Sequence, residues 1–434
     1  MNISIPKYDL IIVGGGAAGL MAACRIEKKL SVLLLEKEDM LGKKLTATGN
    51  GRCNLSNREM EAIYFHGQNV WFTDLILRRF GVDEVLSIFR EMGLFLRVED
   101  GRVYPYSMQA RSVRDALVKR VTLSSVEVRT GAKVVGVAKS AGLRLGDFAL
   151  SEGQSFIVTL ADGSTCASEL ILICAGGMAT PKLGSDGSGY ALFENFGHTL
   201  ITPRPALVQL ICRPVRKRLA GTRVRGKITV RPAARQPQLS ERASLGEILF
   251  TDYGLSGIPA LNVSGLVGQC LKESKSVPVE LDLFPEMEID QLMDYLFRRR
   301  DELPELPVDD WGGGFLPATV SQTIINEVLG GKRSRSLTLR RLSDKDLHRL
   351  AIAAKTRTME VVDTKGFSFA QVTAGGMDTS EFDPGTLESI HMPGLFAAGE
   401  ILDIDGDCGG YNLHWAWASA LAASEGIIRY HDRN

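Results

Sequence analysis

Hydrophobic and polar positions at the start of the chain predict a strand, a turn and a helix. Residues 8–13 form an apolar run that ends at Val13, and a glycine cluster then opens into alanine-rich, helix-forming sequence. A second apolar run, residues 31–35, ends at Glu36. Short apolar runs on both sides of a helical stretch predict a βαβ unit with parallel strands.

The glycine cluster fits the G-x-G-x-x-G pattern of dinucleotide-binding folds at Gly14, Gly16 and Gly19. The first glycine permits a tight turn, the second lets a pyrophosphate approach the backbone, and the third lets the helix pack closely on the strand. Glu36 lies 17 residues after Gly19, where a carboxylate can accept hydrogen bonds from a ribose. The alternative is a glycine-rich turn without a ligand. This pattern alone does not separate FAD from NAD.

Apolar patterns further along add elements to this first domain. In chain order they predict helices within 57–95 and at 113–121, a pair of strands in 126–137, one hairpin arm at 156–160 and a buried strand at 170–174. The last strand is followed by the small residues Ala175, Gly176 and Gly177. Because ligands lie beyond such strand ends in parallel sheets, we expect the backbone here to touch the dinucleotide.

The pattern changes at about residue 199. Short alternating runs, prolines and glycine-rich turns predict an antiparallel β domain up to about residue 283, and residues 285–350 read as polar helices. Afterwards the pattern predicts β structure at 358–362 and 367–372, a strand with small residues at 394–400 and an alanine-rich helix at 415–430. The first domain is therefore expected to be discontinuous, with its closing pieces near the C-terminus.

The composition of the 434-residue chain is that of an ordinary globular protein, with 44% hydrophobic and 24% charged residues. Its 51 Lys and Arg balance 51 Asp and Glu, which gives no overall attraction to nucleic acid or an anionic membrane. Residues 10–24 are apolar but too few to span a bilayer. Seven scattered cysteines without a C-x-x-C pair fit reduced thiols. We expect a soluble cytoplasmic protein with a small-molecule substrate and no nucleic-acid or membrane partner.

The loop at residues 41–54 is rich in small residues and carries Lys43, Lys44 and Arg52 without an acid. Cations and backbone N–H groups beside a dinucleotide site suit a diphosphate and an electron-rich ring. The alternative is a solvated basic loop. Its place directly after the βαβ unit favours the cofactor.

A second motif, near the C-terminus, favours FAD. Glu400 follows an apolar strand and can accept hydrogen bonds from ribitol hydroxyls. Residues 405–413 open the last helix, and N–H groups between Gly410 and Leu413 can stabilise negative charge at the N1–C2=O edge of a reduced flavin. This is the electronic tuning that a protein can offer a flavin.

With these blocks identified, the chain resembles the BaiN/YhiN-type flavoproteins, also described as aminoacetone oxidase-like FAD-binding enzymes. The matching blocks follow the family order over nearly the whole chain: GGGAAGL, GKKLTATGNGRCN, ICAGGMATPKLGSDGSGY, LFTDYGLSGIPAL, QVTAGGM and GLFAAGEILDIDGDCGGYNLHWAWASA. The resemblance implies an α/β fold, a glutathione-reductase-like FAD-binding Rossmann domain interrupted by a β-barrel domain with a helical insert. We expect the FAD domain at 1–195 and 373–434, the barrel at 196–284 and 351–372, and the helical insert at 285–350.

Carried over by position, the resemblance also implies a set of FAD contacts. For the pyrophosphate and the adenosine they are Gly14, Gly16, Ala17, Ala18, Glu36, Lys37 and Val134. For the diphosphate and the flavin they are Lys43, Lys44, Gly51, Arg52, Cys53, Asn54, Ala175, Gly176, Glu400, Asp407, Gly410, Tyr411, Asn412 and Leu413. Two positions depart from the family, which has threonine and glutamine where this chain has Cys408 and His414.

Three side chains near the expected flavin could take part in chemistry. Cys53 and Cys408 could form a redox-active pair, although neither has a cysteine nearby in sequence, and two small buried residues are the favoured interpretation. His414 could donate a proton, because histidine titrates near neutrality, or it could face away on its helix. The sequence indicates no other catalytic acid or base.

The stretch Arg213–Arg235 holds nine basic residues and no acid. It could receive an anionic substrate or the phosphates of NADPH, but a solvated face of the barrel is favoured. We find no second nucleotide-binding βαβ pattern, so NAD(P)H would dock transiently over the flavin or use the inserted domains. Nothing in the sequence indicates an oligomeric state.

These observations lead to three functional hypotheses. The first is an FAD-dependent oxidoreductase, fed by NAD(P)H, that reduces C=C bonds conjugated to a carbonyl, as the resemblance implies for bile-acid intermediates. The second is an amine or aminoketone oxidase that uses O₂. The third is a non-catalytic flavoprotein that binds RNA or protein through Arg213–Arg235.

Overall fold

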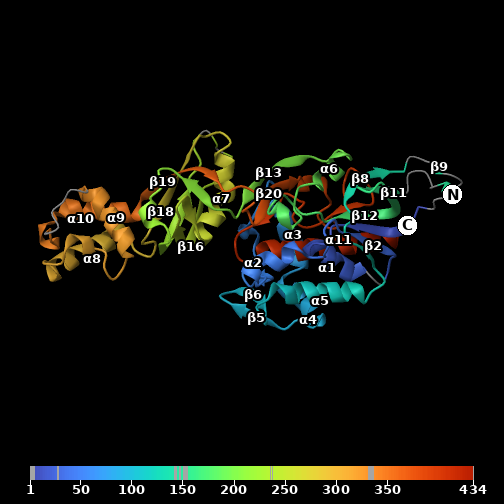
Figure 1. Cartoon of the computed structure of the whole chain (residues 1–434), viewed down its shortest axis with the longest axis horizontal. Helices are drawn as coiled ribbons and strands as arrows, with labels where there is room; N and C mark the ends of the chain where they lie inside the picture. Colours follow the sequence, from blue (N-terminus) through green and yellow to red (C-terminus); the bar gives the residue numbers. More distant parts are fainter. Residues whose placement is uncertain are drawn as a thin grey trace. The chain divides into compact units, whose positions relative to one another are not determined.

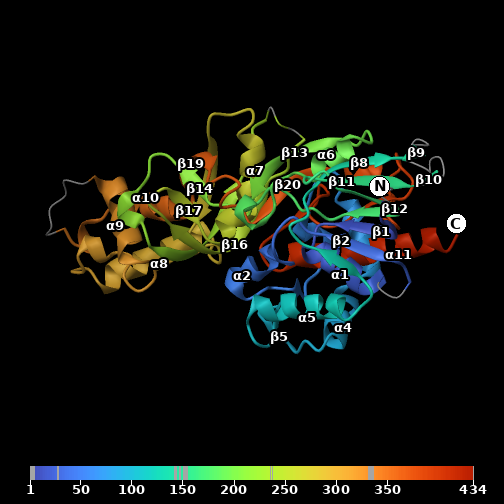
Figure 2. The same cartoon turned by 45° about the vertical axis from the view of Figure 1, so that its right-hand side comes forward.

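The computed structural model of the chain describes residues 5–26, 29–140, 155–234, 236, 238–330 and 337–433, and the backbone at 144–145 and 148–149. Its contacts divide the chain into two compact units (Figures 1 and 2). The first unit comprises Met1–Arg204 and Val372–Asn434, and the second comprises Pro205–Gln371.

The first unit is built on a sheet that has seven strands among the described residues. In spatial order they are β7 (Glu127–Arg129), β2 (Val32–Leu35), β1 (Lys7–Val13), β12 (Thr165–Ile173), β11 (Phe156–Leu160) and β8 (Val134–Lys139), and β21 (Leu395–Ala397) also pairs with β12. Strands β7, β2, β1, β12 and β21 pair in parallel, and β11 and β8 are antiparallel. The expected parallel βαβ unit is confirmed, and its apolar runs are buried.

Helix α1 (Ala17–Ile26) packs against α11 (Tyr411–His431) and α5 (Ala110–Thr122). The remaining helices of this unit are α2 (Thr48–Gly51), α3 (Trp71–Arg79), α4 (Val82–Glu91) and α6 (Tyr190–Glu194). Strands outside this sheet are β3 (Ser56–Asn57), β4 (Phe65–His66), β5 (Leu96–Glu99), β6 (Arg102–Pro105), β9 (Arg144–Leu145), β10 (Phe148–Ala149), β13 (Leu200–Ala206), β20 (Val372–Met377) and β22 (Asp405–Gly406). Of the helices that the structure describes, none has both the length and the apolar character needed to cross a membrane.

Local details differ from the sequence-based expectations. Residues 126–137 do contain two strands, but β7 pairs with β2 and β8 pairs with β11, not with each other. The chain is redirected between them at Gly131, which has a φ of +66° and donates its N–H to Glu38 O. Residues 57–95 contain two helices separated at Gly81 together with short strands. Residues 367–371 form turns rather than a strand.

The second unit contains a closed barrel with six strands among the described residues. Around the barrel they are β14 (Leu210–Cys212), β17 (Gly254–Ser256), β16 (Arg242–Phe250), β15 (Arg223–Val230), β18 (Val277–Asp282) and β19 (Arg357–Thr364). Helix α7 (Ile258–Cys270) packs on β15 and β16. Helix α10 (Asp344–Lys355) packs on both α8 (Ile289–Glu302) and α9 (Ala318–Leu329). The contacts group all of these in one unit, and the three-domain boundaries stay a prediction.

The contact between α1 and β1 depends on a missing side chain. A Cβ atom at Gly19 would lie 1.9 Å from Gly14 O and 3.4 Å from Ile12 Cγ2. Real Cβ atoms do not approach backbone oxygen so closely, and the oxygen cannot rotate away as a flexible side chain can. Only glycine therefore lets α1 start this close to the end of β1.

Helix α11 is held in the core by polar side chains whose hydrogen bonds are satisfied. The indole N–H groups of Trp415 and Trp417 donate to Gly399 O (3.2 Å) and Leu55 O (3.1 Å). His414 is fully buried, with Nε2 3.1 Å from Phe80 O and Nδ1 2.9 Å from Ser56 Oγ. Because a carbonyl only accepts, Nε2 carries the proton and Nδ1 accepts from the serine. Burial lowers the pKa of His414 to about 4.

Replacing Gly19 with alanine is predicted to destabilise the first unit by about 2 kcal/mol or more, because α1 must shift to relieve a contact with backbone. Urea unfolding of the ligand-free protein, followed by circular dichroism, measures the change. Gly16→Ala is the matched control, since nothing lies within 4 Å of a Cβ at that position. Equal stability of the two variants would contradict this account of the turn.

His414→Gln is predicted to reduce the acid sensitivity of folding. Between pH 6.5 and about 4, the imidazole of His414 is less protonated in the native state than in the unfolded chain. The contribution of His414 to stability therefore falls as pH decreases through that range. The slope for one such group is at most about 1.4 kcal/mol per pH unit. Thermal unfolding from pH 7.5 to 4.5 should show Tm falling less steeply in the variant, which keeps a donor and an acceptor. Parallel curves would show that His414 does not titrate on unfolding.

Candidate functional site

The turn after β1 forms an anion-binding end of helix α1. Gly14 has a φ of +104°, and a Cβ there would lie 2.5 Å from Cys174 O, while the space around Gly16 is open. The first intrahelical bond runs from Leu20 N–H to Gly16 O at 3.0 Å, so the N–H groups of Ala17 and Ala18 have no partner within the helix. The first turn carries no acidic side chain. Backbone donors and the positive end of the helix dipole thus face a free space, as pyrophosphate binding requires.

The carboxylate of Glu36 is fixed against this turn. One oxygen accepts from Gly15 N–H at 2.6 Å and the other from Glu38 N–H at 2.8 Å. Burial raises the pKa of Glu36. Each oxygen keeps a second lone pair that can accept a ribose hydroxyl. Lys37 was predicted to contact the adenosine ribose, but its Nζ forms an ion pair of 2.6 Å with Asp186 Oδ1. Burial alone would raise the pKa of Asp186, but the hydrogen bonds that its carboxylate accepts and the charge of Lys37 together lower that pKa to about 2.

Acids that lie elsewhere in the sequence pair with two of the three cations of the loop at 41–54. Lys43 Nζ is 2.6 Å from Glu38 Oε2, and Lys44 Nζ is 2.8 Å from Glu400 Oε2. Arg52 is exposed and has no ion-pair partner among the described residues. Arg52 is therefore the cation of this loop that is left available for an anionic group.

Backbone with positive φ shapes the end of the same loop. Gly49, Asn50, Gly51 and Cys53 all have left-handed conformations, with φ between +55° and +80°. The space around Gly51 is open to a ligand. Asn54 Oδ1 is buried without a hydrogen-bond partner in the described part of the chain, which leaves it able to accept from a bound group.

The start of α11 meets this loop. Gly410, with a φ of +102°, ends the turn, and a Cβ there would lie 2.5 Å from Ser56 O and 2.8 Å from Asn54 Oδ1. The first turn of α11 has neither a side-chain cap nor an acid, so its N–H groups remain available. The N–H groups of the first turn of α11 can donate, and Asn54 Oδ1 beside them can accept. This arrangement suits the edge of a flavin ring, which carries both hydrogen-bond donors and acceptors.

Most predicted side chains on the C-terminal motif are already engaged within the protein. Asp407 Oδ1 lies 2.8 Å from His66 Nε2, and Tyr411 stacks on Tyr64 with ring centroids 4.6 Å apart. Asn412 binds both the N–H and the C=O of Gly406, at 2.8 and 2.6 Å. These residues therefore shape the backbone, and Leu413 adds a half-buried apolar side chain.

The structure brings the separate sequence blocks together. A Cβ at Gly14 would lie 3.1 Å from Ala175 Cα, and one at Gly399 would lie 3.0 Å from Ala18 Cβ. Gly176, next to Ala175, has a φ of +73°. Val134, the predicted adenine contact, is buried at the start of β8.

Two supporting residues escaped the sequence analysis. Thr373 donates its N–H to Glu400 Oε1 at 2.9 Å, and its hydroxyl accepts from Met178 N–H and Ala179 N–H at 2.8 and 3.0 Å. Asp403 is buried and accepts from Gln68 N–H at 2.9 Å, and burial raises its pKa to about 7. The signal for Asp403 was present, as a carboxylate inside the apolar run 401–404.

Cys53, Cys408 and His414, the side chains considered for a part in the chemistry, have properties that favour a structural role. All seven cysteines are thiols, and burial raises the pKa of both Cys53 and Cys408 to about 12. A thiol with so high a pKa is a poor nucleophile at neutral pH. His414 is buried with both ring nitrogens bonded within the protein, which favours the interpretation that it faces away from any substrate.

Acids on other segments of the second unit pair with four of the eight described basic residues in the stretch Arg213–Arg235. Arg223 pairs with Glu247 and Arg225 with Glu286, at 2.8 Å for the latter. Arg231 contacts both Glu241 and Glu280, and Arg216 contacts Glu327 at 2.7 Å. Arg235 lies outside the described residues.

Comparisons with known proteins agree with this architecture. A family model described as HI0933-like protein Rossmann domain matches residues 8–426. The 3-dehydro-bile acid delta(4,6)-reductase of Clostridium scindens is 37% identical over 95% of this chain and 97% of its own length. The ribosomal RNA dihydrouridine synthase of Escherichia coli is 28% identical over 97% of this chain and 98% of its own.

A solved structure of a 3-ketosteroid-delta4-(5alpha)-dehydrogenase from Rhodococcus jostii, in complex with 4-androstene-3,17-dione, aligns over 98% of this chain and 97% of its own, with 14% identity and a TM-score of 0.47. A likeness at that score decides neither fold nor function. The family match over nearly the whole chain, the relative at 37% identity and the glycine turn that fits a pyrophosphate lead to one conclusion: the chain belongs to the HI0933-like Rossmann family and is an FAD-dependent oxidoreductase.

Proposed function

We propose that this protein reduces a C=C bond conjugated to a carbonyl in a small, steroid-like substrate, with NAD(P)H as the source of electrons. The observation that carries the proposal is the near full-length relationship, at 37% identity, to a protein named as a 3-dehydro-bile acid delta(4,6)-reductase. Bound FAD would supply hydride transfer, which the side chains of a protein cannot provide. The chain would supply binding, orientation and charge.

The residues proposed to hold the cofactor fall into two groups. At one end, N–H groups of Ala17 and Ala18 would receive the pyrophosphate, and Glu36 would accept from the ribose. At the other, N–H groups at the start of α11 and the unpartnered Asn54 Oδ1 would receive the ring. Donors fixed in the backbone stabilise developing negative charge without reorganising, which favours reduction of a flavin.

Two named relatives support the reaction type from different substrates. A bile-acid enone and the uracil ring each contain a C=C bond conjugated to a carbonyl, and both relatives' names describe its saturation. Such a reaction adds hydride to the β-carbon and a proton to the α-carbon. Neither name describes an oxidase, so the aminoketone oxidase hypothesis is not carried further.

A small molecule is favoured over ribosomal RNA for this chain. RNA binding draws on basic groups that are free to meet phosphates. Here the arginines at 216, 223, 225 and 231 are paired with glutamates of the same unit, and the whole chain has equal numbers of acidic and basic residues. Half of the described basic residues of the stretch are thus engaged, and the chain as a whole has no excess positive charge, which favours a small molecule; those without an acidic partner among the described residues are Arg213, Lys217, Arg218 and Lys227.

Gly16→Ala is predicted to weaken FAD binding at least about tenfold while leaving the fold intact. The added methyl group points into the open space where the pyrophosphate is proposed to approach. Flavin absorbance of the purified protein and titration of the stripped protein with FAD measure the effect. Gly268→Ala, in α7, is the matched control, because a Cβ there also meets nothing within 4 Å. Unchanged FAD affinity in G16A would contradict the proposed pyrophosphate position.

An anaerobic titration of the holoenzyme with NADPH and then NADH tests the electron source. We expect flavin absorbance to bleach with one of them and to return on addition of a 3-oxo bile acid with a conjugated C=C bond. Unmodified ribosomal RNA is the competing acceptor, and flavin reoxidation by RNA alone would overturn the small-molecule proposal. No bleaching by either nicotinamide would overturn the proposed donor.

A further inference from the structure

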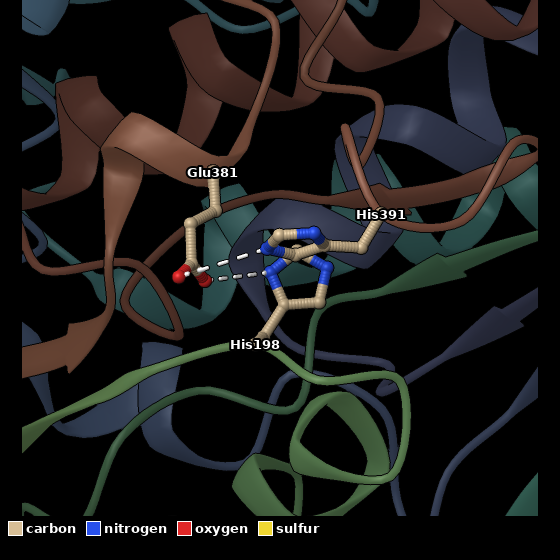
Figure 3. Close-up of side chains that lie close together, drawn as sticks. All are labelled: His198, Glu381 and His391. Carbon is tan, nitrogen blue, oxygen red and sulfur yellow. Dashed lines mark hydrogen bonds and ion pairs between the residues drawn. The ribbon is translucent and has the colours of Figure 1, made fainter.

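Three side chains with metal-binding groups meet in the first unit, outside the residues proposed to hold FAD. They are His198, Glu381 and His391, and Figure 3 shows both imidazole rings directed at the carboxylate. His198 Nδ1 lies 3.1 Å from Glu381 Oε2, and His391 Nε2 lies 3.7 Å from Glu381 Oε1. The three ligand atoms all lie within 4.8 Å of one another.

Backbone hydrogen bonds place these side chains. Ile390 N–H donates to Glu381 O at 3.0 Å, and Asp383 N–H donates to Glu388 O at 2.8 Å, so the intervening segment turns back on itself. His391 therefore follows directly beside Glu381. On the other side, Thr199 donates its N–H and its hydroxyl to the Glu381 carboxylate, at 2.8 and 2.7 Å, which fixes the neighbouring His198.

The surroundings of His198 suit a metal ligand. Its Nε2 lies 2.7 Å from Ser389 Oγ, and its ring stacks on Phe382 with centroids 4.6 Å apart. Histidines that bind metals commonly hold their second nitrogen in such a contact, which orients the ring.

We propose that His198 Nδ1, the Glu381 carboxylate and His391 Nε2 bind a zinc ion. Bonds of about 2.0–2.1 Å in a tetrahedral site separate neighbouring ligand atoms by roughly 3.3 Å. The two imidazole nitrogens lie 3.1 and 3.7 Å from different oxygens of the Glu381 carboxylate, and the ligand atoms lie within 4.8 Å of one another, so zinc would draw the three side chains slightly together. Two imidazoles and one carboxylate suit Zn²⁺, whereas Mg²⁺ and Ca²⁺ prefer oxygen ligands. On binding, the proton of His198 moves from Nδ1 to Nε2. The Ser389 hydroxyl then accepts from Nε2 instead of donating to it, and gives up one of the backbone N–H bonds that it accepts from His391 and Met392.

The site has a route to solvent and a structural consequence. The His198 side chain has no exposed surface, but that of His391 is 37% exposed, so zinc and the fourth ligand, a water, reach the site from that side. The ligands come from the segment before β13 and from the turn that leads into β21. Zinc binding therefore cross-links two segments that are far apart in the sequence.

Isothermal titration of the tag-free, FAD-loaded protein with ZnCl₂ tests the site. We expect one equivalent to bind and to raise Tm by about 5 °C at saturation, and His391→Ala to weaken binding at least about tenfold. His391 is half-exposed, so this variant should fold. His348→Ala, at an exposed position on α10, is the control for loss of a surface histidine and should bind as the parent does. Equal zinc affinity in H391A and the parent would overturn the proposal.

X-ray absorption at the zinc edge separates this site from adventitious binding to thiols. The proposal requires nitrogen and oxygen neighbours at about 2.0–2.1 Å, and sulfur at about 2.3 Å in the parent would contradict it. His391→Cys should retain zinc and introduce one sulfur neighbour at about 2.3 Å. A spectrum of this variant without sulfur would show that zinc binds elsewhere.

Discussion

The absence of a side chain at Gly19 is the constraint on which the first unit depends. A hydrogen atom at that position lets α1 begin beside Gly14 O, and this contact determines where the helix points its first N–H groups. A bulkier residue would move the helix and, with it, α5 and α11, which pack on α1. One steric contact thus sets both the packing of three helices and the direction of the donors proposed for a pyrophosphate.

Two carboxylates beside the proposed cofactor site, Glu36 and Glu400, are fixed by partners within the first unit. Glu400 joins Lys44, from the loop after β2, to the N–H of Thr373 at β20, and Glu36 is held by backbone N–H groups. In these contacts the two carboxylates position loops. Backbone N–H groups and the Arg52 side chain remain available to an anionic ligand. The phosphates of a dinucleotide are negatively charged and can accept hydrogen bonds from the backbone N–H groups at the start of α1, where no acidic side chain competes.

The sequence predicted the features that depend on local pattern. The turn after Val13, the buried strands and the helices of residues 285–350 follow from apolar spacing and glycine placement, and the family blocks identified the FAD-dependent class. It did not predict how far-apart charges pair: nothing in the spacing of Lys44 indicates Glu400, more than 350 residues later. The basic stretch at Arg213–Arg235 likewise reads as a patch in sequence, because the glutamates that pair with four of its arginines lie outside it. His414 could have been exposed or buried, and only tertiary packing against Ser56 and Phe80 decides it.

One edge of strand β12 pairs with two different strands, β11 and β21, and this has a consequence for the order in which the chain folds. Its first half pairs with β11, which is made just before it, but Ile171 to Ile173 pair with Leu395 to Ala397. During synthesis the ribosome must produce the whole second unit before that part of the edge is covered. The second unit, by contrast, is continuous in sequence. We therefore expect the inserted unit to complete its folding on the ribosome while the first unit waits for β21 and α11, so the domain that begins the chain is the last to be finished.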